Sequence, residues 1–419
     1  MKKLFYYLGK SELTLLMIVS LLLIGSCDRE VSLKGEPVNN YGGFSRNNSY
    51  ERFGDFYRQI YYVDSYDSVL SGGAIAPLLA LSGYKIVFPS SEGEINLFDN
   101  RELKWHKKLD SDNVASAGMC ADKEQNIYVI DNFGKLYSFS VSGKLRWKKY
   151  FNKITVNDIV TFSDLLAVDD GIIAASSDGK ITKYSFDGTV IWQRNFNSAI
   201  LKYFPADNKG NIILPLSKNV FGETDTLAFL SNNGKVLWKK HFLNARIIKP
   251  PVYSYNKIYI SGLVVIKEEK YPVIYCLDTK GRVKWKKELS LMPRFLSVDS
   301  DDRLYVVAYN SGLGKPISLL IVYDKYGKKV WDKYIEVSIT SPILIAEKIL
   351  AFAGSDEIAS GLYFMRKNGF LENVISLSEA PILNLQPIVT PNLNILFGGA
   401  EKVQIIRIDE TPMKKFIPW

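Results

Sequence analysis

The chain has 419 residues, of which 47% are hydrophobic and 23% are charged. This balance is that of an ordinary globular protein and excludes wholesale disorder. The formal net charge of +9 favours anionic partners such as lipid headgroups, and the export predicted below argues against nucleic acid as a partner.

The first 26 residues have the pattern of a secretory signal peptide. Three lysines precede an apolar run over 13–25, which is shorter than the ~20 residues that a membrane span needs. The run ends in LIGSC at 23–27, which resembles the lipobox of bacterial lipoproteins, although Ile24 stands where Leu is commonest. The resemblance implies that Cys27 is lipidated and becomes the mature N-terminus. The alternative is an uncleaved anchor helix, and both interpretations put the rest of the chain outside the cytoplasm.

A polar segment links the predicted lipid to the folded part of the chain. Residues 27–55 contain Cys27 followed by a stretch rich in Asn, Gly and Ser, which is typical of a flexible tether. Removal of residues 1–26 takes away three Lys and one Glu and leaves a charge of +7. The remaining cysteines, Cys120 and Cys276, lie in apolar strand-like runs, so we expect buried and unpaired thiols.

A repeat dominates the rest of the chain. Six tryptophans recur at intervals of 42 to 47 residues, and a glycine stands four residues before each of the last five, as it does before Asn373 in a weaker copy. A glycine there suits a hairpin turn with positive φ, and the Trp that follows can bury a large face against a neighbouring unit. The repeat residues are Trp105, Trp147, Trp192, Trp238, Trp285 and Trp331, with Gly143, Gly188, Gly234, Gly281, Gly327 and Gly369.

Each repeat holds four short strands in about 45 residues, which is the size of a β-propeller blade. Eight units can be counted between 76 and 409. We therefore predict one domain over 56–419, an all-β, eight-bladed propeller of four-stranded antiparallel blades, preceded by the signal peptide and the tether.

The run DTKGRVKW at 278–285 resembles the repeat of quinoprotein-type (PQQ-like) propellers, and it recurs along most of the chain. Together with the lipobox, the tandem resembles BamB-type lipoproteins of the outer-membrane protein assembly machinery. The resemblance implies a monomeric, non-enzymatic scaffold that is lipid-anchored, faces the periplasm from the outer membrane and binds envelope proteins. The inner membrane and the cell surface remain open as locations. A WD-repeat propeller is disfavoured, because Trp331-Asp332 is the only Trp-Asp pair.

Two other functions compete with the scaffold. One is a ligand-binding or sensor propeller that uses the central channel. The other is a quinoprotein enzyme, which would need a calcium-binding cluster and often a vicinal cysteine pair. The chain has no Cys-Cys pair, and the short repeats leave no room for a cofactor pocket. We expect no catalytic residue, no metal and no cofactor.

Histidines and acidic clusters fit this expectation. His106 and His241 each follow a repeat Trp and should lie in the outer strands of different blades, too far apart for a shared site. The acidic runs that begin at Asp207 and Asp299 lack the spacing of a calcium loop, so hairpin turns are the better interpretation.

Cations follow each Trp in the strand predicted to be outermost. Lysines on an exposed edge block unwanted strand pairing, and a basic perimeter attracted to an anionic membrane is the alternative. These cations are Lys107, Lys108, Lys148, Lys149, Arg194, Lys239, Lys240, Lys286 and Lys287.

Uneven connections between the second and third strands indicate where a partner binds. They are short in units two and three and longer in units four, five and six, over 218–224, 263–272 and 310–316. Loops displayed on a rigid ring commonly carry binding, although tolerated drift is an equal explanation. The candidate residues are Lys218, Phe221, Lys267, Glu268, Glu269, Lys270, Leu313 and Lys315.

The ends of the chain predict how the ring closes. Residues 56–63 alternate like a strand and stand in the register of an outer strand before the first unit. We predict that they pair beside 402–408 and complete blade eight, which removes a free sheet edge. The competing interpretation puts 413–417 in that place.

Overall fold

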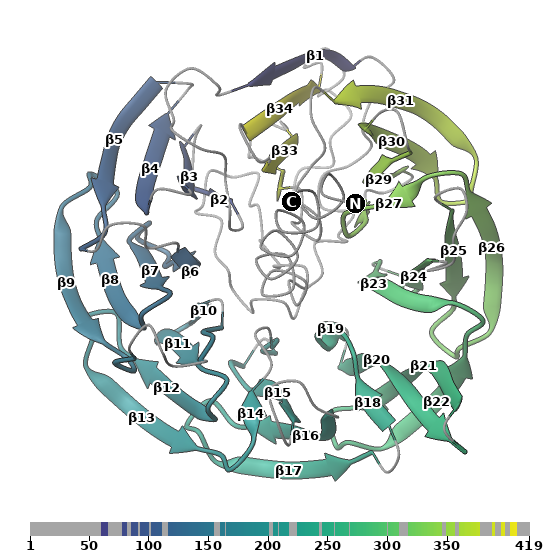
Figure 1. The fold of residues 1–419 in the computed structure, drawn as a ribbon, viewed down its shortest axis with the longest axis horizontal. Helices are drawn as coiled ribbons and strands as arrows, with labels where there is room; N and C mark the ends of the chain where they lie inside the picture. The colour runs from purple at the N-terminus through teal and green to yellow at the C-terminus, as the bar shows by residue number, and fades with distance from the viewer. Residues whose placement is uncertain are drawn as a thin grey trace, which may run out of the picture.

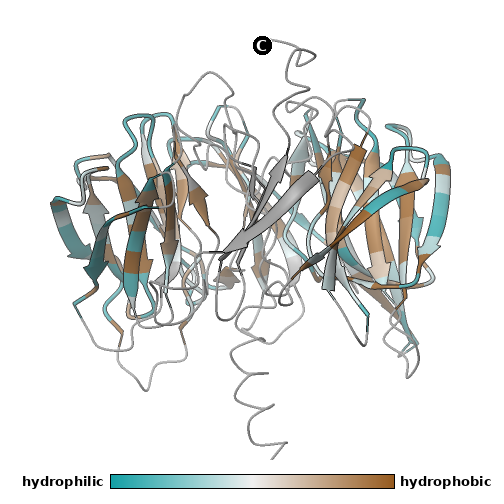
Figure 2. Cartoon of the chain, turned by 90° about the horizontal axis from the view of Figure 1, so that it is seen from above, coloured by the Kyte–Doolittle hydropathy of each residue, from teal (hydrophilic) through white to brown (hydrophobic). Residues whose placement is uncertain are grey.

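The computed structural model is a ring of antiparallel β-sheets (Figure 1). In the side view of Figure 2, the strands run between two faces at which the turns lie. The structure describes residues 60–65, 78–81, 85–90, 93–99, 102–110, 116–154, 160–163, 165–200, 204–207, 209–217, 224–242, 245–254, 256–267, 269–299, 301–309, 317–345, 349–356, 360–377, 388–389, 395–398 and 403–408.

Seven blades are built from consecutive strands, and we number them in chain order with each blade running from inside to outside. Blade 1 contains β2 (Leu79–Ala80), β3 (Lys85–Pro89), β4 (Glu94–Asp99) and β5 (Glu102–Lys108). Blade 2 contains β6 (Ser116–Ala121), β7 (Ile127–Asp131), β8 (Lys135–Phe139) and β9 (Leu145–Tyr150). Blade 3 contains β10 (Leu166–Val168), β11 (Gly171–Ala175), β12 (Lys180–Tyr184) and β13 (Val190–Asn195).

The next four blades continue in the same order around the ring. Blade 4 contains β14 (Ala199–Ile200), β15 (Ile212–Ser217), β16 (Thr224–Leu230) and β17 (Val236–His241). Blade 5 contains β18 (Ala245–Ile247), β19 (Val252–Ser254), β20 (Lys257–Ile266), β21 (Glu269–Asp278) and β22 (Val283–Glu288). Blade 6 contains β23 (Met292–Val298), β24 (Leu304–Tyr309), β25 (Ser318–Tyr323) and β26 (Lys329–Ile335). Blade 7 contains β27 (Ser338–Ile339), β28 (Leu344–Ile345), β29 (Ile349–Ser355), β30 (Ser360–Arg366) and β31 (Leu371–Leu377).

A closing sheet joins the two ends of the chain. It contains β32 (Ile388–Val389), β33 (Ile395–Gly398), β34 (Val403–Ile408) and, on the outside, β1 (Ile60–Ser65). β1 pairs antiparallel with β34, with Ile60 opposite Ile408 and Ser65 opposite Gln404, so the predicted ring closure is confirmed (Figure 1). Residues 413–417 lie outside the described residues.

The predicted set of eight uniform, four-stranded blades is corrected by this topology. Only seven blades are continuous in the chain, and blades 5 and 7 have five strands because two short strands share the innermost position. The interruption in blade 5 contains Pro250 and Pro251, and that in blade 7 contains Pro342. Proline has no backbone N–H to donate to a sheet, so it splits the inner strand in two. The predicted signal peptide and tether, residues 1–55, lie outside the described residues.

The turns alternate between the two faces of the ring. The tight turns that join the third and fourth strands of each blade lie on one face, which we call the tight-turn face. The connections between the second and third strands lie on the other, which we call the loop face. In the tight turn of blade 5, the Asp278 carboxylate accepts hydrogen bonds from the backbone N–H of Lys280 (3.0 Å) and Arg282 (2.9 Å). Such side-chain caps explain why turn formers precede the repeat glycines.

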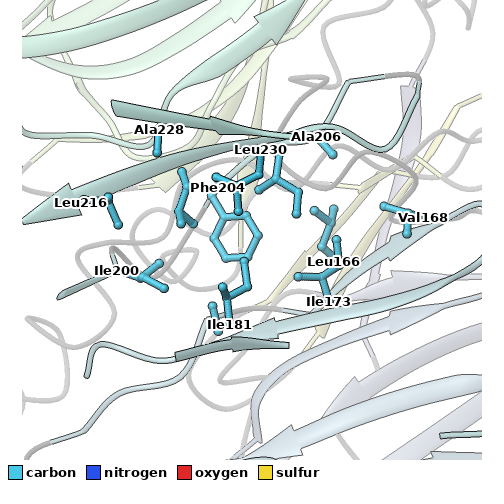
Figure 3. Packing of buried hydrophobic residues seen from close by; sticks show 13 residues of the cluster. Leu166, Val168, Ile173, Ile181, Ile200, Phe204, Ala206, Leu216, Ala228 and Leu230 are labelled. Carbon is cyan, nitrogen blue, oxygen red and sulfur yellow. The ribbon is translucent and has the colours of Figure 1, made fainter. Parts of the chain in front are cut away.

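The apolar core lies between the blades. Six clusters of buried side chains each join two successive blades, from blades 1 and 2 to blades 6 and 7. In the cluster between blades 3 and 4, Phe204 packs among Leu166, Ile181 and Leu230 (Figure 3). Trp192 of the outer strand β13 is partly buried and packs against this cluster. Because neither blade covers its own apolar face, each blade needs its neighbour.

The six repeat tryptophans link successive blades at the rim, where they are partly buried. The indole N–H of each donates a hydrogen bond to a backbone carbonyl of the next blade, two residues before the turn glycine, at 2.8–3.4 Å. We call this contact the interblade latch. The acceptors are Val141, Phe186, Asn232, Thr279, Lys325 and Lys367.

The turn glycines lie against the tryptophan rings of the interblade latch. All six have positive φ, between 78° and 87°. At Gly234, an added Cβ would also lie 2.7 Å from the Trp192 ring of the preceding blade. The glycine is therefore required twice in this turn, once by the backbone conformation and once by the ring packed on it.

Several rim cations are engaged in the same contacts. Lys149, Arg194 and Lys333 each stand two residues after a repeat Trp and donate to the carbonyl of the next turn glycine. Lys148, which is next to Lys149 in β9, forms an ion pair with Asp110, the residue that follows the outer strand of blade 1 (2.9 Å). These four cations therefore stabilise the contact between neighbouring blades, in addition to the role expected of lysines at an exposed sheet edge.

Candidate interaction surface

Among the described residues of the loop face, the hairpin of β20 and β21 is the longest connection between a second and a third strand. The connection in blade 2 is a tight turn closed by Gly134 N–H to Asp131 C=O (3.1 Å). The predicted loop over 263–272 is instead regular hairpin, because β20 and β21 are ten-residue strands joined by Lys267 and Glu268. The long connection expected over 263–272 is therefore reduced to residues 267 and 268.

The hairpin extends beyond both strands that flank it. On its inner side, pairing with β18 ends where Ala245 meets Val264. On its outer side, pairing with β22 begins at Val273, and one further bond joins Leu289 N–H to Pro272 C=O (2.8 Å). Within the described part of the chain, residues 265–271 pair only with one another and with Val264, so this end of the hairpin projects as a two-stranded ribbon.

One side of the ribbon is apolar. Val264 lies opposite Tyr271 and Ile266 opposite Glu269, which puts these four side chains on one side because strand residues alternate. Ile266 is 52% exposed and Tyr271 is 38% exposed. The Tyr271 hydroxyl donates to the Glu269 carboxylate, and this bond raises the Tyr271 pKa. The ribbon therefore presents an exposed apolar patch held in place by a local hydrogen bond.

Charged side chains surround this patch. Lys267, Glu269 and Lys270 are exposed at the tip, and Lys267 closes the turn with φ of 48°. An exposed apolar centre with a charged rim is the usual composition of a protein-binding surface. We call residues 264–271 the projecting ribbon from here on.

The remaining predicted partner residues cannot be placed beside it. Lys218, Phe221, Glu268, Leu313 and Lys315 lie outside the described residues. The charged tip was predicted from the sequence, whereas Ile266 and Tyr271 were not. The alternation of apolar and charged residues around Lys267 was the signal that could have found them.

Two cations on the inner strands form a second notable pair. Lys249 lies between β18 and β19, and Arg294 lies in β23. Arg294 donates from Nη1 to Ser338 Oγ and Ile339 O, both at 2.9 Å, and its guanidinium lies 4.7 Å from the Tyr309 ring centroid. Burial, with repulsion from Arg294, lowers the pKa of Lys249 to about 8. Such a pair has the chemistry to hold an anionic group.

The acidic runs form turns. In blade 4, Asp207 Oδ1 accepts from the backbone N–H of Lys209 and Asn211, both at 2.8 Å. In blade 6, Asp299 accepts from the N–H of Arg303 (2.8 Å), and burial raises the pKa of this carboxyl. The hairpin interpretation is therefore confirmed for both runs. Within the described ranges, no cluster of three or more His, Cys, Asp or Glu could hold a metal ion.

The histidines and thiols lie as predicted. His106 is in β5 and His241 in β17, in blades 1 and 4. Cys120 and Cys276 are buried and form no disulfide, and burial raises the pKa of Cys276 to about 12. A thiol with that pKa is almost wholly protonated at neutral pH, which makes it a poor nucleophile.

Two observations bear on the membrane. In the part of the chain that the structure describes, no helix has the length and apolar character to cross a bilayer. Cys27 lies outside the described residues, so its lipidation stays a prediction.

The ring of blades, the period of the repeat and the interblade latch define the class of protein, a β-propeller with PQQ-like repeats. Within this class the chain is similar to BamB, because a family model described as outer membrane protein assembly factor BamB matches residues 91–205. No protein matches in a sequence comparison with the curated proteins.

Solved structures show the same fold. BamB from Moraxella catarrhalis is similar with a TM-score of 0.59 at 14% identity, covering 83% of this chain and 99% of that chain. The Dos1 propeller has a TM-score of 0.60 at 11% identity, covering 84% and 95%. The C-terminal WD40 domain of Sif2 has a TM-score of 0.57 at 9% identity, covering 84% and 99%. At these identities the likeness concerns the fold alone.

Proposed function

We propose that this chain is a non-enzymatic, exported lipoprotein scaffold that binds envelope proteins, in a role similar to that of an outer-membrane protein assembly factor. The observation that carries the proposal is the projecting ribbon, an apolar patch with a charged rim on the loop face of a rigid ring. The similarity to BamB supports a protein-interaction role at the level of the family. A lipid on Cys27 would hold the ring at a membrane of the cell envelope.

Rigid display is the proposed mechanism. The latches and the interblade cores hold each blade in register with the next, so the ribbon is ordered before a partner arrives. A partner that docks on an ordered ribbon loses less conformational entropy than one that must first order a loop. The exposed Ile266 and Tyr271 would be the anchoring contacts, and the charges around them would select the partner.

The test is affinity capture from detergent-solubilised envelopes with the tagged protein. We expect Ile266→Ser combined with Tyr271→Ser to reduce capture of a specific envelope protein with no change in thermal stability. The matched control is Val374→Ser combined with Tyr150→Ser, which removes an aliphatic and an aromatic side chain of similar exposure (43% and 50%) from the outer strands of blades 7 and 2. Equal capture by the ribbon variant and the parent protein would contradict the proposal.

A second candidate function rests on Lys249 and Arg294. A propeller that binds an anionic ligand on its inner strands would use these two cations. The test is thermal denaturation with candidate anions, comparing the parent protein with Lys249→Met. A stabilisation that the variant loses would favour ligand binding over scaffolding.

A further inference from the structure

The chain enters the ring on a defined face. In every described blade, the third strand ends at the tight turn that leads to the fourth, so the last residue of the third strand lies at the tight-turn face. In the closing sheet the third strand is β34, and its last residue, Ile408, lies opposite Ile60. Ile60 therefore lies at the tight-turn face. Ile60, the first residue that the structure describes, is therefore on the face opposite the projecting ribbon.

The tight turns of blades 6 and 7 differ from the others. Tyr326, directly before Gly327, is 75% exposed, and Phe370, directly after Gly369, is 60% exposed. The position before the glycine is otherwise polar or charged in blades 2 to 7, and so is the position after it. Those residues are Ser142, Asp187, Asn233, Lys280 and Asn368 before the glycine, and Lys144, Thr189, Lys235, Arg282 and Lys328 after it.

Exposed apolar side chains concentrate near this face. Among the described residues, ten of the fifteen large apolar side chains that are exposed lie in a tight turn or in the first two residues of the outer strand that follows. They are Leu145, Val190, Ile191, Val236, Leu237, Val283, Tyr326, Val330, Phe370 and Leu371. Eight of these ten side chains are aliphatic and two, Tyr326 and Phe370, are aromatic. This number of exposed apolar side chains at one face is unusual for a surface that contacts only water.

Tyr326 and Phe370, which we call the aromatic tips, each have a cation close to the ring. Lys325 Nζ lies 5.2 Å from the Tyr326 ring centroid, and the Arg366 guanidinium lies 5.6 Å from that of Phe370. Lys325 and Lys328 have no acidic partner among the described residues. A ring that enters the headgroup layer beside a cation suits an anionic membrane surface.

The acidic groups described in the tight turns of these blades, and in the outer strands beside them, have partners. Asp324 accepts two backbone N–H groups of its own turn. Asp332 pairs with Lys329 (3.0 Å), and Glu372 pairs with Arg366. In the inner turns of the same face, Asp301 pairs with Arg303 and Asp302 with Lys257. The unpaired charge beside Tyr326 is therefore positive, and it comes from Lys325 and Lys328.

We propose that the tight-turn face lies against the membrane, with Tyr326 and Phe370 inserted among the headgroups of an anionic bilayer. Blade 7 is next to the closing sheet (Figure 1), so the aromatic tips lie on the same side of the ring as the entry of the chain at Ile60. The tips would be a second membrane contact after the lipid. This inference rests on the proposed lipid anchor. It also explains the orientation of the scaffold, because the projecting ribbon then points away from the membrane toward soluble parts of its partners.

The test uses the lipid-modified protein reconstituted on phosphatidylcholine vesicles with or without phosphatidylglycerol. Hydrogen exchange is followed in peptides that contain 324–328, 366–370 and 266–271. We expect exchange in the two tip peptides to slow at least about fivefold on phosphatidylglycerol vesicles relative to detergent micelles, and exchange in 266–271 to stay unchanged. Tyr326→Ser combined with Phe370→Ser should abolish the slowing, and Ile266→Ser combined with Tyr271→Ser should not.

The outcomes separate this inference from the anchor. A protein that stays on the vesicles with unprotected tips overturns the inference and leaves the anchor standing. Protection that appears only when an envelope protein is added would assign the tips to a protein partner instead. A protein that leaves the vesicles overturns the anchor and the inference together.

Discussion

The interblade latch makes a quantitative prediction for two glycines that share a backbone conformation and differ in their surroundings. Gly234 and Gly369 have φ of 78° and 87°, so alanine at either position meets the same backbone penalty, about 1–2 kcal/mol. A Cβ at 234 would lie 2.7 Å from the Trp192 ring, whereas a Cβ at 369 would lie 3.6 Å from Trp331. Overpacking at 234 adds about 1–3 kcal/mol.

We therefore expect Gly369→Ala to lower the free energy of unfolding by about 1–2 kcal/mol and Gly234→Ala by about 2–5 kcal/mol. The measurement is equilibrium urea denaturation with equal m-values, because a changed m-value would indicate an altered transition. In a Trp192→Ala background the ring is gone, and Gly234→Ala should then cost no more than Gly369→Ala does. Equal losses for the two single variants would refute the argument that the ring requires the glycine.

The remaining predictions concern a latch, the lipid and a buried charge. Trp238→Ala should cost about 2–4 kcal/mol, because it removes a partly buried ring and its bond to Thr279, and a loss below about 1 kcal/mol in urea would make the Trp a surface feature. Cys27→Ala should release the protein from membranes, and a variant that still pellets after a carbonate wash would contradict the lipobox interpretation. The pKa of Lys249 falls from 10.5 to about 8 on folding, so its charge destabilises the fold below pH 8 and this cost disappears as the pH rises to 10.5. Lys249→Met should therefore be more stable than the parent protein at pH 7, and the gain should shrink across that interval. A gain independent of pH would indicate a packing effect.

Much of the fold could be predicted because the repeat is a local pattern. The spacing of Trp and Gly reflects one unit of four strands, and each unit needs the same turn and the same rim contact. The closing strand was predictable too, because alternation and register are readable from a single stretch such as 56–63. In the structure this strand is β1, Ile60–Ser65, and it pairs with β34 as expected.

The errors arose where a local pattern has two structural solutions. Residues 263–272 carry both strand formers and charges, and cross-strand pairing from Val264–Tyr271 to Ile266–Glu269 turned an expected loop into a hairpin. The inner strands of blades 5 and 7 were expected to be whole, and each is instead two short strands separated by a segment that contains proline, which has no backbone N–H to donate to the neighbouring strand.

The candidate site depended still more on tertiary structure. The sequence by itself determined the repeat, the antiparallel hairpins, the closing strand and the two buried thiols, because each follows from short-range periodicity and turn chemistry. Only the tertiary structure decided which carbonyl each Trp reaches and which rim cations join blades. Those contacts join residues on different blades, about 40 positions apart, and their partners are set by the geometry of the ring, which no single repeat contains.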